Sequence, residues 1–189
     1  EEVITTAGPL LEAHIAAAYR DIQGYYETNA AEIDEWLAQQ FHTLGHSALA
    51  AEKSQAAYLV VSRLRSGLLT SVAWLQLALY DHTLYFDEQP VYHYCRPDFL
   101  ITFYERDMQS IRQGLKERFL HLQEYELQAV GDEYAERYFE IGHKLLADQA
   151  EQLMAALREM GIKADEELKL LYGDFLDSLA VIWPQEGDA

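Results

Sequence analysis

The clearest metal-binding spacing in this sequence is Glu-x-x-His, formed by Glu140 and His143. Side chains three positions apart share a helix face, and in helical bundles that hold two metal ions such pairs come from two helices, with further Glu residues. Here the motif occurs once with this order. At about 100° per residue, Glu140 falls opposite the apolar stripe that contains Tyr138 and Leu145, so we interpret Glu140 as a solvent-exposed residue.

His42 and His46 are four residues apart, a spacing that allows two imidazoles to bind one metal ion. No Glu follows His42, and Gly45 between them predicts a helix end. Histidines near a helix C-terminus also interact favourably with the helix dipole, so we interpret both as capping or surface residues. A metal-dependent helical-bundle enzyme that uses His42, His46, Glu140 and His143 as ligands is the alternative hypothesis.

The densest aromatic region runs from residue 74 to residue 94. Core packing, or closure of one end of a bundle, is its simplest explanation, and a pocket lined by tyrosine rings and hydroxyls is the functional one. The preceding segment, from Lys53 to Tyr80, contains no acidic residue but carries two arginines that suit an anionic ligand or a partner carboxylate. The predicted ligand-binding residues are Arg63, Arg65, Trp74, Tyr80, Tyr85, Tyr92 and Tyr94.

Cys95 lies close to His82 and His93 in sequence, and a Cys–His pair can act as a nucleophile. No spacing fixes their geometry, so we interpret Cys95 as a small buried hydrophobic residue. As the only cysteine of the chain, it excludes an intramolecular disulfide and a multi-Cys zinc site, and it fits a cytoplasmic location.

The charge balance is strongly acidic, with 32 Asp and Glu against 14 Lys and Arg, a formal net charge of −18 over 189 residues. Such a surface repels nucleic-acid phosphates and anionic membranes, so neither is an expected partner. Solubility explains the charge most simply, and an acidic face for a basic partner is the sharper interpretation. The sequence starts at Glu1 without a Met, which is compatible with a piece of a longer protein.

Apolar residues that recur every three to four positions predict the elements that carry these residues. The fold class expected is all-α, a bundle of about six amphipathic helices, with a small β-hairpin or an irregular aromatic segment near residues 80–96. Residues 1–189 are expected to form a single helical domain, with a weak alternative subdivision into 1–46 and 47–189. The expected helices cover 9–26, 30–44, 48–79, 97–119, 132–160 and a last helix that begins at Asp165.

No Gly-rich phosphate loop, Gly-x-Ser-x-Gly elbow or His-Glu-x-x-His motif is found in the sequence. We therefore predict a non-enzymatic helical binding module with a regulatory or adaptor role. It would bind a protein partner or a small ligand near the Arg- and Tyr-rich region, need no cofactor, and have homodimerisation as one mode of association. Besides the metal-dependent enzyme, a structural or assembly domain of a longer protein is the other alternative.

Overall fold

The computed structural model describes residues 2–53, 55–64, 74–162, 164–174 and 176–184. It divides the chain into two compact units. The first, which we call the helical unit, consists of Glu1–Ala30 and Pro97–Gly142, and the second, the sheet unit, consists of Ala31–Arg96 and His143–Ala189. The single-domain prediction and its weaker boundary at residue 46 stay predictions.

The expected all-α bundle of about six helices is wrong, because a five-stranded mixed sheet accompanies the helices. The helices found in the described residues are α1 (Glu2–Ala50), α3 (Asp98–Lys116) and α4 (Glu124–Glu159), with the short 3-10 helix η1 (Leu84–Phe86). The strands are β1 (Ala56–Arg63), β2 (Leu75–Tyr80), β3 (Val91–Cys95), β4 (Ala164–Asp174) and β5 (Leu179–Trp183).

Two of the expected helices are strands because both of their faces are covered. In β1, nearly every residue from Ala56 to Ser62 is buried, and in β4 the same holds from Leu168 to Tyr172 apart from Lys169. A strand buried on both sides carries apolar residues without alternation, and such a run also satisfies a helical spacing. The predicted helices at 48–79 and from Asp165 rested on such runs. The hairpin that was one alternative for residues 80–96 is present, as β2 and β3 pair antiparallel.

The helical unit is built from α3 and the parts of α1 and α4 that belong to it. The apolar stripe expected for the first helix is buried here, with Leu11, Ala18 and Ile22 at most 2 % exposed. The break expected near Asn29 is confirmed, because its backbone (φ −121°, ψ 22°) leaves helical geometry inside α1. In the described parts of the chain, no helix has the length and apolar character needed to cross a membrane.

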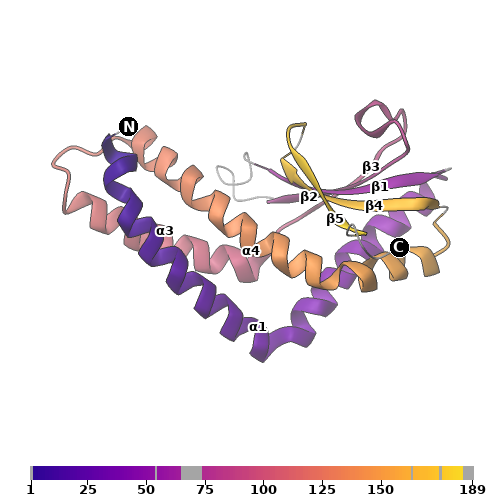
Figure 1. Ribbon diagram of the computed structural model, residues 1–189, viewed down its shortest axis with the longest axis horizontal. Coiled ribbons are helices and arrows are strands. Elements are labelled where there is room, and N and C mark those ends of the chain that lie inside the picture. Colours follow the sequence, from indigo (N-terminus) through magenta and orange to yellow (C-terminus); the bar gives the residue numbers. More distant parts are fainter. Residues whose placement is uncertain (1, 54, 65–73, 163, 175, 185–189) are drawn as a thin grey trace. The chain divides into compact units, whose positions relative to one another are not determined.

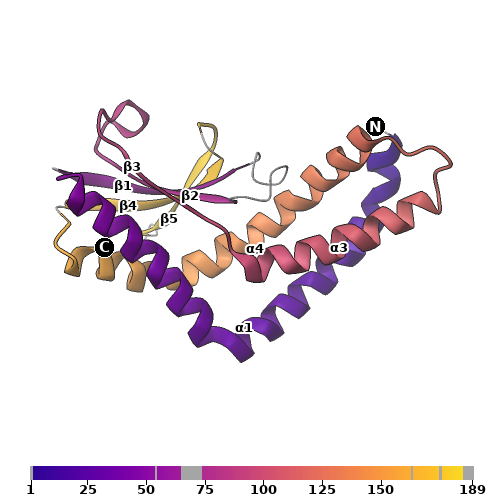
Figure 2. The ribbon, with the colours of Figure 1, turned by 180° about the vertical axis from the view of Figure 1, so that it is seen from behind.

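The sheet unit has the strand order β3-β2-β1-β4-β5. Neighbouring strands are antiparallel except β1 and β4, which are parallel and are joined by a long connection through α3 and α4. The segments of α1 and α4 in this unit lie on the same side of the sheet, as both ribbon views show (Figure 1, Figure 2). Their apolar residues form the main core with Leu59, Leu77 and Leu170. We call this side of the sheet the inner face and the opposite side the outer face.

Gly45 does not end a helix, as the sequence suggested, but lies buried within α1. A Cβ atom at this position would lie 2.7 Å from both Sδ and Cε of Met160 and 3.4 Å from Leu157 Cδ2. The missing side chain therefore allows α1 to approach the end of α4 closely inside the sheet unit.

Candidate functional site

The outer face of the sheet carries a row of polar residues across its strands. Side chains alternate between the faces of a strand, so the paired residues of neighbouring strands share a face. The pairing places Tyr94 of β3 opposite Gln76 of β2, and Gln76 opposite Ser62 of β1. The Nε2 atom of Gln76 donates a hydrogen bond to the Tyr94 hydroxyl at 2.9 Å, which confirms that the two side chains lie on one face.

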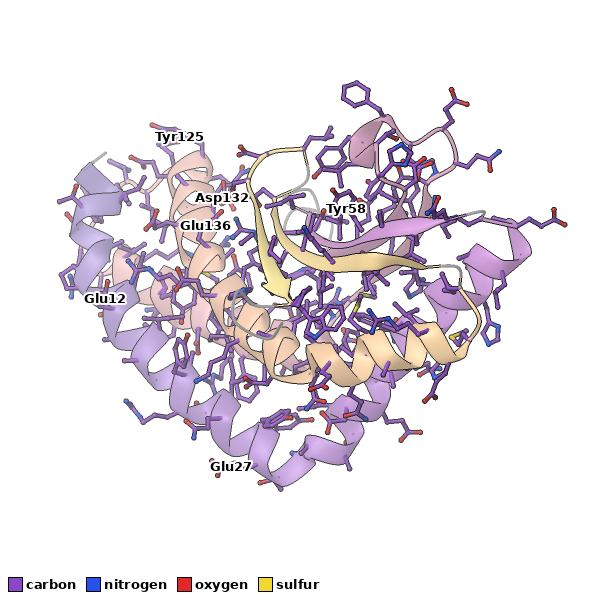
Figure 3. All side chains as sticks on the ribbon, turned by 45° about the vertical axis from the view of Figure 1, so that its right-hand side comes forward. Glu12, Glu27, Tyr58, Tyr125, Asp132 and Glu136 are labelled. Atoms are coloured by element: carbon purple, nitrogen blue, oxygen red, sulfur yellow. The ribbon has the colours of Figure 1, made fainter. Side chains whose placement is uncertain are left out.

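Tyrosine rings surround this row. Tyr80, on the outer face of β2, contacts the ring of Tyr92 edge-on at 6.1 Å and that of Tyr85 at 5.5 Å between centroids. Burial raises the pKa of Tyr80 well above its usual value, so this hydroxyl stays protonated. Tyr58 lies beside Tyr80 in register and points to the side of the sheet away from α4 (Figure 3). In contrast to the buried Tyr80, Tyr92 and Tyr94 are 40 % and 54 % exposed.

Two buried polar atoms of the row lack hydrogen bonds. Ser62 is 1 % exposed and Gln76 is 4 % exposed, and among the described residues neither Ser62 Oγ nor Gln76 Oε1 has a hydrogen-bond partner. An unsatisfied buried polar group costs about 1–3 kcal/mol, so native proteins keep few of them and those often mark sites of function. The polar row of the outer face therefore has hydrogen-bonding capacity that its own residues leave unused.

The loop between β2 and β3 borders this face and is held by a buried ion pair. Lys53 Nζ lies 2.6 Å from Asp87 Oδ2 and also donates to the Gln89 carbonyl at 3.0 Å. Asp87 accepts the backbone N–H of Asp81 as well. The loop is thereby fixed to the end of α1.

At η1, the hydroxyl of Tyr85 accepts the backbone N–H of Leu176 at 3.3 Å, which links the loop to the β4–β5 turn. These contacts position the aromatic side chains at the edge of the outer face.

No family model, curated protein or solved structure matches this chain. The function is therefore inferred from the geometry of the site alone.

The residues predicted from the sequence are brought together only in part. Tyr80, Tyr85, Tyr92 and Tyr94 gather at the outer face as described, whereas Trp74 is buried just before β2. Arg63 belongs to the opposite, inner face, where its Nη2 atom lies 2.6 Å from Asp174 Oδ2. It therefore has a structural partner within the sheet. Arg65 lies outside the described residues.

Three residues of the outer face were missed in the sequence, namely Tyr58, Ser62 and Gln76. They were assigned to one long helix, in which nothing marked them as part of a site. The polar Gln76 within the apolar run Leu-Gln-Leu-Ala-Leu-Tyr is the feature of this segment that could have indicated a strand rather than a helix.

The proposed metal ligands are spread over the two units. His42 and His46 lie four residues apart on the continuous α1 and are both exposed. Glu140 is exposed in the helical unit, whereas His143 opens the sheet-unit part of α4 and packs its ring against Tyr172 at 5.2 Å. In the described part of the chain, no group of three or more His, Cys, Asp or Glu residues is arranged to hold a metal ion.

A second polar cluster, in the helical unit, has its hydrogen-bonding groups paired with one another. Asp107 is buried, and its Oδ2 atom accepts hydrogen bonds from the hydroxyls of Tyr134 at 2.9 Å and Tyr138 at 2.7 Å. Its Oδ1 atom accepts from Arg106 Nε at 3.0 Å, and Arg106 also reaches Asp21. Burial, reinforced by the hydrogen bonds to Asp107, raises the pKa of both tyrosines, which keeps them as donors. We interpret this cluster as one that stabilises the packing of α3 against α4.

Cys95 faces the inner core, and burial raises the pKa of its thiol to about 12. Since the thiolate is the reactive form, we expect native protein to react with iodoacetamide far more slowly than protein unfolded in urea. Mass spectrometry of timed reactions measures both rates. Rapid alkylation of the native chain would contradict the burial of this side chain.

Proposed function

We propose that this protein is a non-enzymatic binding module that uses the outer face of its sheet to bind a protein partner in a regulatory or adaptor role. The single observation that carries the proposal is the pair of exposed tyrosines, Tyr92 and Tyr94, on the outer face of β3, beside the buried Gln76 whose Oε1 atom has no hydrogen-bond partner among the described residues. Tyrosine is enriched among residues that dominate binding energy, because its ring buries a large area and its hydroxyl bonds at the rim.

The surroundings of these residues support the same interpretation. Tyr92 is backed by the buried Tyr80, and Tyr94 is held by Gln76, so both rings are fixed by neighbours before any partner arrives. A preorganised aromatic surface loses little conformational entropy when it binds. Phe86, at the end of η1, is 88 % exposed and adds an apolar side chain at the border of the same face.

The proposal is tested by selecting peptides from a random display library on the full chain. We expect sequence families that bind the native protein and bind the Tyr92→Ser/Tyr94→Ser variant roughly tenfold more weakly, because the central aromatic contacts are lost. Affinities are measured by fluorescence anisotropy, and thermal unfolding checks that each variant is folded.

The matched control is Tyr19→Ser/Tyr125→Ser. It removes two tyrosines of the helical unit that are 40 % and 71 % exposed, and it should leave binding unchanged (Tyr125 is labelled in Figure 3). Selected peptides that bind the Tyr92/Tyr94 variant as well as the native chain would contradict the proposal, as would a selection without any enriched family.

A further inference from the structure

Resting on the function proposed above, we propose that the partner segment is extended and positively charged, and that it binds along β3 with arginine or lysine side chains over Tyr92 and Tyr94. The proposed function gives the location of the binding face, and this inference gives the chemistry of the segment that binds there.

The overall charge of the chain favours a partner of positive charge. With 32 acidic and 14 basic residues, two copies of this chain repel one another, and so do this chain and a nucleic acid. A basic segment is attracted instead, and long-range attraction also raises its association rate. The charge thus favours a cationic protein partner over a second copy.

The local charges agree with the overall charge. Lys53, which contacts this loop, is already paired with Asp87, and both side chains are at most 4 % exposed. The remaining acidic groups of the loop are Asp81 and the exposed Glu88, and His82 is the other exposed titratable side chain there. Hydrogen bonds from the side chain and backbone of Thr83 lower the pKa of Asp81, so its carboxylate is ionised at neutral pH.

The aromatic rings add a second attraction for cations. Asp81 follows directly after Tyr80 at the end of β2, and the ring of Tyr80 contacts Tyr92. The face of a tyrosine ring attracts ammonium and guanidinium groups, and arginine also stacks on it.

The position of β3 determines the backbone geometry of the partner. It is the last strand on its side of the sheet, so in the described chain its far edge has no neighbouring strand. An added strand continues the hydrogen-bonded ladder and directs every second side chain to the outer face. Tyr92 and Tyr94 lie on that face, whereas His93 between them points to the inner side and contacts Gln40 Oε1 through its Nε2 atom at 2.9 Å.

The test uses a short, fluorescently labelled peptide in which arginine and valine alternate, titrated with the full chain. We expect it to bind roughly tenfold more tightly than three relatives, because each loses one element of the recognition. These are a peptide that alternates glutamate with valine, one of the same composition with the arginines grouped at one end, and one with alternate backbone nitrogens methylated. Binding should also weaken as salt is added.

Variants of the chain locate the site. We expect Tyr92→Ser/Tyr94→Ser to weaken binding of the alternating Arg–Val peptide roughly tenfold, and Asp81→Asn/Glu88→Gln to weaken it roughly threefold. Asp132→Asn/Glu140→Gln removes the same charge from the helical unit and should leave the affinity unchanged. Equal weakening by this control would overturn the inference, because it would mean general attraction to an acidic chain.

Two further outcomes separate this inference from the function on which it rests. Selected library peptides that depend on Tyr92 and Tyr94 but lack an excess of Arg and Lys would leave the binding module intact and overturn the cationic segment. A Tyr92- and Tyr94-dependent dimer in sedimentation would identify a second copy as the occupant and would overturn it as well.

Discussion

Replacing Asp107 by alanine is expected to lower the free energy of unfolding by about 3–5 kcal/mol, because two buried tyrosine hydroxyls lose the carboxylate that accepts their hydrogen bonds and a cavity is left. Tyr134 and Tyr138 are at most 1 % exposed, so water does not replace the carboxylate. Arg106 is half-exposed and keeps Asp21, so its contribution to the loss is small. Urea unfolding followed by circular dichroism measures the change.

Two variants make this expectation specific. Asp107→Asn keeps an oxygen that accepts from one or both tyrosines, and it should lose roughly half as much stability. Glu140→Ala removes an exposed carboxylate of α4 and should stay within about 0.5 kcal/mol of the native chain. If Asp107→Ala unfolds at the same urea concentration as Glu140→Ala, the hydrogen-bonded cluster does not stabilise the helical unit.

The second large effect is expected for Lys53→Met, which leaves the Asp87 carboxylate buried without its cation. Breaking a buried ion pair by removing one partner costs about 3–5 kcal/mol. Solvent does not screen the remaining charge, because the two side chains are only 4 % and 3 % exposed. The loss should appear as a lower midpoint in urea, together with faster amide exchange between Asp81 and Pro90.

The double variant Lys53→Met/Asp87→Asn provides the control. It removes both charges, while the single asparagine oxygen remains an acceptor for one of the two backbone N–H groups, of Asp81 or Gln89, that bond to the carboxylate. We expect it to be more stable than Lys53→Met alone, and a double-mutant cycle that includes Asp87→Asn gives the coupling between the pair. A double variant that is less stable than the single one would show that the hydrogen bonds accepted by the Asp87 carboxylate outweigh the cost of its unpaired charge.

These two clusters differ from the outer face of the sheet in one respect that matters for function. The acceptors of Asp107 and Asp87 are used within the protein, so these carboxylates stabilise the fold. Ser62 Oγ and Gln76 Oε1 have no such partners in the described chain, and Gln76 adjoins the exposed Tyr94. The polar groups of the two clusters hold the structure, whereas we propose that the outer face serves a partner.

The sequence predicted the structural role of some residues correctly and of others wrongly. Gly45 and Asn29 were both expected to lie at helix ends, but only Asn29 interrupts the helix, while Gly45 serves close packing against Met160. The arginine at position 63 was expected near the tyrosines because it is close to them in sequence. Alternation along β1 directs it to the other face, towards Asp174. The gathering of tyrosines between residues 80 and 94 was visible without a structure, since neighbours in a hairpin stay neighbours.

The sequence by itself determined the local properties of this protein: its acidic charge, the amphipathic helices of the helical unit and the aromatic hairpin. These depend on residues that are a few positions apart. Only the tertiary structure decided that Ala56–Arg63 and Ala164–Asp174 are adjacent parallel strands, because this pairing joins segments about a hundred residues apart and buries both faces. A segment buried on both faces carries no period of its own, so its partners, rather than its pattern, determine whether it is a helix or a strand.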